Sequence, residues 1–187
     1  PMMYKATDRE TTDFFKEVAA ETDLPILVYN NPVDYKIEIK PEMFEELLRF
    51  DNIQAVKEST RDVSNVTRLR TRFGDRLRIL CGVDTLALES LLLGADGWVA
   101  GLVCAFPAET VALYRHALAG ELEAARDLYR WFLPLLELDI HPQLVQNIKL
   151  AESLTGLGTE FVRKPRQPLR GDERARVLHI IQNSLHR

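Results

Sequence analysis

Lys57 is the side chain whose type and setting best suit chemistry on a carbonyl compound. It directly follows the predicted buried strand Ile53–Val56, whereas the other lysines lie in helical or polar segments. A buried ammonium group is costly, so such an amine either pairs with a carboxylate or becomes neutral. A neutral amine condenses with a ketone or aldehyde to form a Schiff base. Position alone leaves two structural alternatives open: an ion pair with Glu58 or another strand's carboxylate, and a solvated strand end.

Tyr29 lies near the end of the preceding apolar run, Pro25–Asn30, one strand-plus-helix unit before Lys57. The two side chains could therefore face the same cavity, where a phenol can pass protons to and from an amine. A packed strand aromatic is the structural alternative for Tyr29. The segment Asn30-Asn31-Pro32 is most simply a turn.

Other candidate groups are weaker. Gly82-Val83-Asp84 and Gly101 offer backbone N–H groups to an anion, but the sequence has no dinucleotide or nucleoside-triphosphate fingerprint. The four histidines lack carboxylate companions at ligand spacing, so we predict no metal site. The basic segment Arg163–Arg170 is typical of a solvated face or a subunit contact.

The elements that must position these residues follow a repeating order. Four short apolar runs, bounded by turn residues, are each followed by a stretch with helical spacing of apolar residues. Such runs are typical of strands buried on both faces of a parallel sheet, so the predicted fold class is α/β. The predicted strands are 25–30, 53–58, 77–82 and 97–102, and the predicted helices are 8–20, 41–50, 62–73, 85–93 and 107–119.

The strand pattern stops near residue 120. Beyond it we predict three helices, at 121–138, 143–154 and 171–185, with a surface loop at 156–168. We therefore divide the chain into a strand-and-helix domain, residues 1–120, and a C-terminal helical domain, residues 121–187.

Composition excludes several kinds of partner. The formal net charge of −4 supplies no basic field to hold a nucleic acid. No apolar run approaches the ~20 residues of a membrane-spanning helix and no secretory signal opens the chain, so we predict a cytoplasmic protein without a membrane partner. Cys81 and Cys104 lie in apolar contexts and are predicted to be buried free thiols.

The order and spacing of these motifs resemble the dihydrodipicolinate synthase and N-acetylneuraminate lyase family of class I, Schiff-base-forming aldolases and lyases. The resemblance runs from Pro1 to about Leu185 and rests on Tyr29-Asn30-Asn31-Pro32, Val56-Lys57-Glu58-Ser59-Thr60, Gly82-Val83-Asp84, Gly97 to Gly101, and the tail from Gly156 to Leu169. It implies a (β/α)₈ barrel with a C-terminal helical extension, in which residues 1–120 form the second half, about strands 5 to 8.

The same resemblance implies the roles of the site residues. Lys57 would attack the keto carbon of pyruvate, a related 2-keto acid or a cyclic imino acid, and Tyr29 would shuttle protons. The residues implied to hold the substrate are Gly82, Asp84, Val99 and Ala100. No metal ion or organic cofactor would be needed, because the protonated imine polarises the substrate itself. A homo-oligomer, a dimer or a tetramer, is expected.

Departures from the family pattern narrow the range of expected substrates. Dihydrodipicolinate synthases carry an arginine shortly after the Tyr-Asn-x-Pro turn to grip the second substrate's carboxylate, where this chain has Val33-Asp34-Tyr35. Their Pro-Tyr-Tyr segment is here Pro1-Met2-Met3-Tyr4. Four segments together, Pro1–Lys5, Tyr29–Pro32, Leu88–Ala95 and Leu102–Pro107, look most like the 1-pyrroline-4-hydroxy-2-carboxylate deaminases of hydroxyproline breakdown. Dihydrodipicolinate synthase, a keto-deoxy sugar acid aldolase or dehydratase, and a non-catalytic barrel relative remain alternatives.

The length of 187 residues is short for a complete barrel. A closed (β/α)₈ barrel typically takes ~250 residues and rarely fewer than ~200. Four parallel strands alone would leave two open sheet edges and an unfilled interior. We therefore expect the chain to be part of a polypeptide of about 300 residues.

Overall fold

The computed structural model describes residues 4–99 and 101–185, and the chain divides into two compact units. The first unit extends to Gly82 and also includes Glu89–Trp98. The second unit contains Val83–Leu88 and continues from Val99. The domain boundary expected between residues 120 and 121 stays a prediction.

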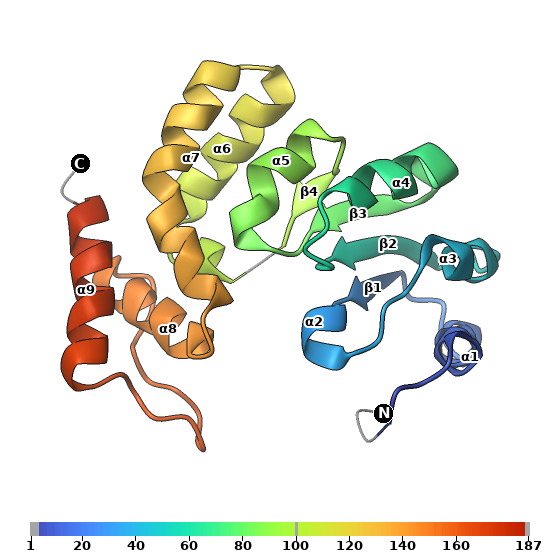
Figure 1. Cartoon of the computed structure of the whole chain (residues 1–187), viewed down its shortest axis with the longest axis horizontal. Helices are drawn as coiled ribbons and strands as arrows, with labels where there is room; N and C mark the ends of the chain where they lie inside the picture. Colours follow the sequence, from blue (N-terminus) through green and yellow to red (C-terminus); the bar gives the residue numbers. More distant parts are fainter. Residues whose placement is uncertain (1–3, 100, 186–187) are drawn as a thin grey trace. The chain divides into compact units, whose positions relative to one another are not determined.

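Four parallel strands, hydrogen-bonded in sequence order, form the sheet of the first unit (Figure 1). They are β1 (Ile26–Asn30), β2 (Ile53–Glu58), β3 (Arg78–Cys81) and β4 (Gly97–Trp98). Each lies within a predicted strand, although β4 is much shorter than predicted, and helices connect successive strands. The α/β fold class predicted from the sequence is confirmed.

Local signals explain where the helices of the first unit begin and end. They are α1 (Asp8–Ala20), α2 (Pro32–Tyr35), α3 (Pro41–Leu47), α4 (Ser64–Phe73) and α5 (Ala87–Leu92), of which α5 continues from the second unit into the first. Thr7 caps α1 by accepting from the Glu10 N–H at 3.2 Å, while the Glu10 carboxylate accepts from the Thr7 N–H at 2.7 Å. Pro41 opens α3, and Gly74 ends α4 with a φ of 53°.

The two faces of the sheet differ in burial. On the face that meets α4, the strand side chains are buried: Val28, Asn30, Val56, Glu58, Ile79 and Cys81. The opposite face, called the open face below, carries Leu27, Tyr29, Ala55, Lys57 and Leu80, which are exposed or half-buried. Leu27 is 44% exposed and Tyr29 38%. Because parallel sheets are normally covered on both faces, this apolar exposure is unusual.

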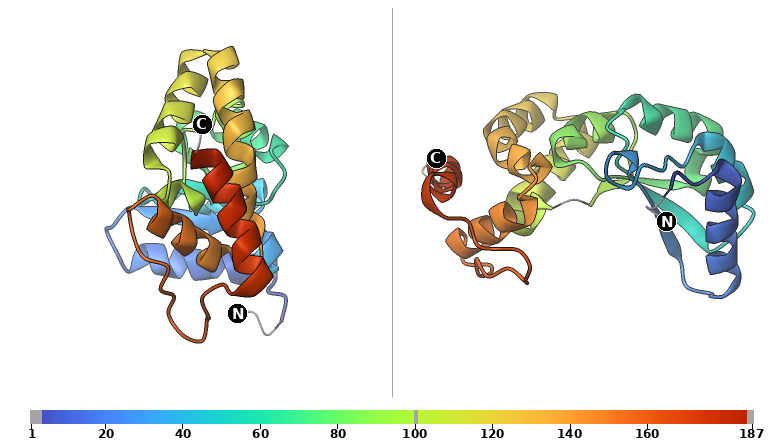
Figure 2. Two further views of the ribbon diagram at one scale, coloured as in Figure 1. Left: turned by 90° about the vertical axis from the view of Figure 1, so that its left-hand side faces the viewer. Right: turned by 60° about the horizontal axis from the view of Figure 1, so that its bottom comes forward.

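The second unit is helical. It contains α6 (Pro107–Ala119), α7 (Leu122–Leu136), α8 (Leu144–Leu154) and α9 (Gly171–Leu185), each within a predicted helix. Helices α6 and α7 lie side by side, and α9 packs against α7 and α8 (Figures 1 and 2). The rings of Phe106, Trp131 and Phe132 form an aromatic cluster, with 5.8 Å between the centroids of Phe106 and Phe132. The Trp131 indole N–H donates to the Ser184 carbonyl at 3.2 Å.

Two expectations are corrected here. The strand predicted at 97–102 ends at Trp98, because its apolar continuation leads into a 3₁₀ turn, Leu102–Cys104, rather than along the sheet. In that turn Leu102 is buried, whereas Cys104 faces outward, so the prediction of two buried thiols is correct only for Cys81. None of the helices described is both long and apolar enough to cross a membrane.

Candidate active site

Lys57 and Tyr29 lie beside each other on the open face of the sheet. The register of β1 and β2 pairs their Cα atoms, and both side chains leave the same face. The Lys57 Nζ atom is 4.4 Å from the centroid of the Tyr29 ring, within cation–π range. The structure thus brings together the two residues that the sequence selected for chemistry, whose catalytic roles stay predictions.

Among the residues that the structure describes, the Lys57 amine has no carboxylate partner. Within residues 4–99 and 101–185 it forms neither an ion pair nor a hydrogen bond with another group. The ring of Tyr29 is its nearest recorded partner. Both versions of the ion-pair alternative, with Glu58 or with a carboxylate of another strand, are therefore wrong for the part of the chain described.

Glu58 points to the opposite face of the sheet because successive strand side chains alternate. Its carboxylate accepts hydrogen bonds from the Asn30 side chain at 3.2 Å, the Asn65 side chain at 2.9 Å and the Thr60 N–H at 2.8 Å. Burial raises the pKa of the Glu58 carboxyl above its ordinary value of 4.5, although these hydrogen bonds oppose the rise. Glu58 is therefore part of the buried scaffold beneath Lys57.

Gly82 gives the Lys57 side chain room. A Cβ atom at this position would lie 2.0 Å from the Ser59 Oγ atom and 2.7 Å and 2.9 Å from Cγ and Cε of Lys57. The Gly82 N–H is already donated to the Glu58 carbonyl at 2.9 Å. What Gly82 supplies in this structure is therefore space next to Lys57, rather than a free N–H group for an anion.

Ser59 places a hydroxyl group next to Lys57. Ser59 is only 3% exposed, and its Oγ atom has no hydrogen-bond partner among the groups described. Ser59 directly follows β2, two residues after Lys57, and its side chain reaches the same space beside Gly82. A buried hydroxyl without a partner is rare in folded proteins and is available to a polar ligand.

The Tyr29 hydroxyl group has one defined partner. The Asn31 side chain donates to the Tyr29 oxygen at 2.9 Å and to the Asp34 carboxylate at 2.7 Å. The Tyr35 ring meets the Tyr29 ring edge-on, with 5.6 Å between the centroids. The exit of β1, expected to be only a turn, thus contains a short helix, α2, whose residues hold the Tyr29 side chain.

The remaining predicted site residues belong to the second unit or lie outside the described residues. Asp84 is fully buried, and its carboxylate accepts from the Leu102 N–H at 2.8 Å. Val99 is exposed, and Ala100 lies outside the described residues. A Cβ atom on Gly101 would lie 2.0 Å from the Asp139 carboxylate, so Gly101 allows a close approach of that side chain.

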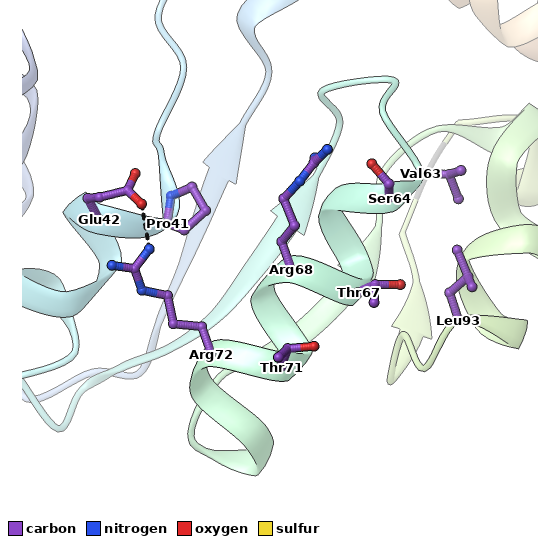
Figure 3. Close-up of a pocket in the computed structure, with 9 residues that line it drawn as sticks. All are labelled: Pro41, Glu42, Val63, Ser64, Thr67, Arg68, Thr71, Arg72 and Leu93. Carbon is purple, nitrogen blue, oxygen red and sulfur yellow. Dashed lines mark hydrogen bonds and ion pairs between the residues drawn. The ribbon is translucent and has the colours of Figure 1, made fainter.

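Two cavities of the first unit differ in their relation to Lys57 and Tyr29. The larger, about 610 Å³, opens between α3 and α4 and is lined by Arg68, Arg72 and hydroxyl side chains of α4 (Figure 3). Its Arg72 is paired with Glu42, and neither Lys57 nor Tyr29 lines it. The smaller, about 330 Å³, is mostly apolar and is lined by Tyr29 and Tyr35. Lys57 lines neither of these two cavities, so of the candidate residues only Tyr29 adjoins one of them, the smaller.

Sequence reasoning missed Asn31 and Ser59 as members of this site. Asn31 was interpreted as a turn residue, although an Asn followed by proline is also a signal for a helix cap. Ser59 lies two residues after Lys57, so strand alternation alone places both on one face. The same alternation points Lys57 and Glu58 to opposite faces, so the sequence alone already argues against an ion pair between them.

Comparison with known proteins identifies the family to which these residues belong. The model of the dihydrodipicolinate synthetase family matches residues 1–184. A 4-hydroxy-tetrahydrodipicolinate synthase of Thermomicrobium roseum is 34% identical over 172 residues, which cover 90% of this chain and 56% of the relative. One of Aquifex aeolicus is 34% identical over 139 residues, which cover 74% of this chain and 47% of that relative.

Solved structures agree with the sequence matches. The crystal structure of dihydrodipicolinate synthase from Aquifex aeolicus superposes with a TM-score of 0.88 at 29% identity, covering 96% of this chain and 61% of that one. The 4-hydroxy-tetrahydrodipicolinate synthase of Methylacidiphilum fumariolicum SolV gives 0.85 at 30% identity, with coverages of 97% and 62%. This chain therefore spans less than two thirds of the length of these relatives.

Proposed function

The chain belongs to the dihydrodipicolinate synthetase family, and on that premise we propose that the natural protein is a lyase that forms a Schiff base through Lys57. Its substrate is a small 2-keto acid or cyclic imino acid. One observation carries the proposal: the Lys57 amine reaches the open sheet face with no carboxylate partner in the described residues, against the ring of Tyr29. A paired ammonium group would have to lose its partner before it could react.

The proposed reaction uses Lys57 as nucleophile and Tyr29 as proton carrier. The neutral amine attacks the carbonyl carbon, and one amine proton moves to the carbonyl oxygen to give a carbinolamine. A second proton transfer to that oxygen releases water and leaves a protonated imine. The imine then accepts the electron pair of a breaking bond to the neighbouring carbon. We assign these proton transfers to the Tyr29 hydroxyl group because the Tyr29 ring lies beside the Lys57 amine.

We also propose which other residues of this chain contact the substrate. Gly82 keeps the space beside Lys57 free, and Ser59 offers a buried hydroxyl without a partner to a substrate oxygen. Asp84 supports the backbone of the segment after β4 through the Leu102 N–H, and we propose that Val99 and Ala100 in that segment contact the substrate. All these residues are contributed by this chain.

We further propose that the open sheet face lines the interior of an eight-stranded (β/α)₈ barrel, with β1 to β4 as its last four strands. The exposed Leu27 and Tyr29 side chains support this, because such apolar groups are expected to be buried in the complete protein. The chain's coverage of 61% of the Aquifex aeolicus structure also supports it. Isolation of the natural protein as a cooperatively folded species of 21.4 kDa would contradict it.

For the substrate we favour 1-pyrroline-4-hydroxy-2-carboxylate, with deamination as the outcome. The supporting observation is Asp34, which stands where the resemblance leads us to expect a carboxylate-binding arginine and lies within hydrogen-bond reach of Asn31, beside Tyr29. A negative charge here disfavours a second substrate with its own carboxylate. The Lys57 adduct would assist loss of the substrate hydroxyl group before ammonia is released by hydrolysis.

Dihydrodipicolinate synthesis is the second candidate, because the relatives named above are 4-hydroxy-tetrahydrodipicolinate synthases. The two candidates differ in a product that is easily measured. Incubation of the natural protein with the hydroxy-pyrroline carboxylate should release ammonia. Condensation of pyruvate with aspartate semialdehyde, without ammonia release from the first substrate, would favour the synthase. Aldol cleavage of a keto-deoxy sugar acid would favour the aldolase.

Two broader features complete the proposal. We propose a cytoplasmic protein, in keeping with the soluble character of its composition, and a homo-oligomer, in keeping with the family resemblance. Sedimentation of the natural protein checks the second point, since a mass equal to one polypeptide would contradict it.

Borohydride reduction tests the Schiff base directly. Reduction of the natural protein with pyruvate, or with the substrate, should leave a covalent adduct on Lys57 that peptide mass spectrometry locates. A Lys57→Ala variant should form none. The matched control is Lys5→Ala, which removes an exposed lysine and should leave the adduct unchanged. Absence of an adduct on the folded natural protein would end the proposal, and a non-catalytic relative would then be favoured.

A further inference from the structure

We propose that the side-chain amide of Asn31 directs the hydroxyl proton of Tyr29 toward the substrate. The inference rests on the Schiff-base function proposed above and concerns a different residue of the same site. Asn31 acts through Tyr29 and is therefore a positioning residue. The evidence is the hydrogen-bond arrangement around its amide group.

Three hydrogen bonds engage both ends of the Asn31 side-chain amide. Its nitrogen lies 2.9 Å from the Tyr29 hydroxyl oxygen and 2.7 Å from a carboxylate oxygen of Asp34. Its oxygen accepts from the Asp34 N–H at 3.2 Å. Asn31 is only 6% exposed, so solvent has little access to this group. An amide group has two N–H donors and one oxygen acceptor, and here each has a partner.

These partners determine the orientation of the Asn31 amide, that is, where its oxygen and its nitrogen lie. The backbone N–H of Asp34 can only donate, so it requires the amide oxygen. The Asp34 carboxylate accepts at its contact, so it requires the amide nitrogen. The second N–H of that nitrogen therefore points at Tyr29, and a flipped amide would break both contacts with Asp34.

The orientation of the amide decides the orientation of the phenol. Because Asn31 presents an N–H, the Tyr29 oxygen accepts at that contact and its own proton must point elsewhere. The Tyr29 ring lies against the Lys57 amine on the open face, and we infer that the freed O–H serves the adduct formed there. The same N–H stabilises the negative charge on the oxygen once the proton has been transferred.

The surrounding chain holds this arrangement in place. Asn31 is the N-cap of α2, and its backbone carbonyl accepts from the Tyr35 N–H at 3.0 Å. The Tyr35 ring meets the Tyr29 ring at an interplanar angle of 79°. Helix α2 thus links the amide and a supporting ring to the same phenol. A purely structural cap would need only the amide oxygen, which separates the two roles experimentally.

Steady-state kinetics of the natural, full-length protein with its Schiff-base substrate tests the inference. Asn31→Asp keeps an oxygen for the Asp34 N–H but removes the N–H that faces Tyr29. We expect kcat to fall by about 10- to 100-fold with KM changed by less than about twofold, within the range for losing acid–base assistance. The matched control is Asn183→Asp, an exposed position on α9 that should leave kcat unchanged.

The decisive measurement repeats the substitution in a Tyr29→Phe background. If Asn31 acts through the Tyr29 hydroxyl, Asn31→Asp should lower kcat no further in that background. An equal reduction in both backgrounds, or no reduction in either, would overturn the inference. Should Asn31→Asp fail to fold, Asn31→Ser takes its place, because serine caps helices well but lacks an N–H for Tyr29. It should give the same kinetic loss and the same dependence on Tyr29.

Failure of this inference is distinguishable from failure of the proposed function. Borohydride trapping at Lys57 in the unsubstituted protein, together with an unaffected Asn31→Asp variant, would remove the role of Asn31 alone. Absence of trapping in the unsubstituted protein would remove the Schiff base and, with it, the basis for assigning Asn31.

Discussion

Neighbouring residues of β1 and β2 meet very different surroundings on the two faces of the same sheet. On the covered face, Glu58 and Asn30 are buried and hydrogen-bonded to each other and to neighbouring groups. On the open face, Lys57 and Tyr29 occupy matching register positions, yet the described residues provide Lys57 with no carboxylate. One pair of strands thus separates the buried, hydrogen-bonded polar groups from the candidate catalytic ones by the direction of their side chains.

The physical reason lies in the cost of burying polar groups. A carboxylate removed from water needs donors, and Glu58 receives three. An amine on a half-exposed face can remain solvated until a substrate displaces the water. Substitutions on the open face should therefore change activity with little change in stability, and those on the covered face should do the reverse.

The largest effect is expected for Lys57→Ala. Loss of the nucleophile should lower kcat/KM by about 10⁴-fold or more, as for other covalent catalysts. The free energy of unfolding should change by about 1 kcal/mol or less, because only the contact with the Tyr29 ring and some methylene packing are lost. Enzyme assay and urea unfolding measure the two quantities. A large loss of stability would show that Lys57 is structural, against the comparison.

Tyr29→Phe should have the next largest effect. The ring beside Lys57 is retained but the proton carrier is removed, so kcat should fall by about 10²- to 10⁴-fold. Borohydride should still trap an adduct at Lys57, more slowly. Pre-steady-state trapping measures this, and unchanged turnover would exclude Tyr29 from proton transfer.

Gly82→Ala tests the space beside Lys57. The new methyl group would approach the Ser59 hydroxyl and the Lys57 chain, shifting the amine. We expect kcat to fall by about 10- to 100-fold, as for other misplacements of a reacting group by about 1 Å. In a Ser59→Ala background, which lacks the closest clash, Gly82→Ala should lower kcat by a smaller factor, measured against Ser59→Ala alone. An equal fall in both backgrounds would contradict this account.

Glu58→Gln should have the smallest effect on activity, within about twofold, and a measurable effect on stability. Both carboxylate oxygens of Glu58 accept hydrogen bonds, one of them from the Thr60 N–H, whereas a glutamine has only one oxygen. Its NH₂ group would therefore face a donor, a mismatch worth about 1–3 kcal/mol. Chemical denaturation at several pH values measures this loss. A large fall in kcat with unchanged stability would place Glu58 in the reactive group instead.

The same variant should change the pH dependence of stability. Because burial raises the Glu58 pKa above 4.5, the folded state holds this proton more tightly than the unfolded state. The stability that this proton contributes is complete at a pH below the ordinary pKa of a glutamate. It is lost as the pH rises through the raised pKa of Glu58 in the folded state. The stability difference between the unsubstituted protein and Glu58→Gln should therefore narrow as the pH rises above 4.5. A difference that is constant or widens would contradict the burial effect.

Much of the fold was predictable because the signals are local. Apolar runs located all four strands, and proline and glycine positions located helix ends at Pro41 and Gly74. The strand predicted at 97–102 is several residues too long, since the apolar side chains of a buried turn resemble those of a strand. Helix α2 was missed because its four residues are too few to show helical periodicity.

For the candidate site, residue order and spacing were enough to place Lys57 and Tyr29 at the ends of neighbouring parallel strands, since these are local properties. The folded structure was needed to show that Lys57 has no carboxylate partner in the described residues, that Glu58 accepts from Asn30 and Asn65, and that Asn31 donates to the Tyr29 oxygen. Such contacts depend on side-chain direction and on distances of a few ångströms, which residue type and spacing leave open.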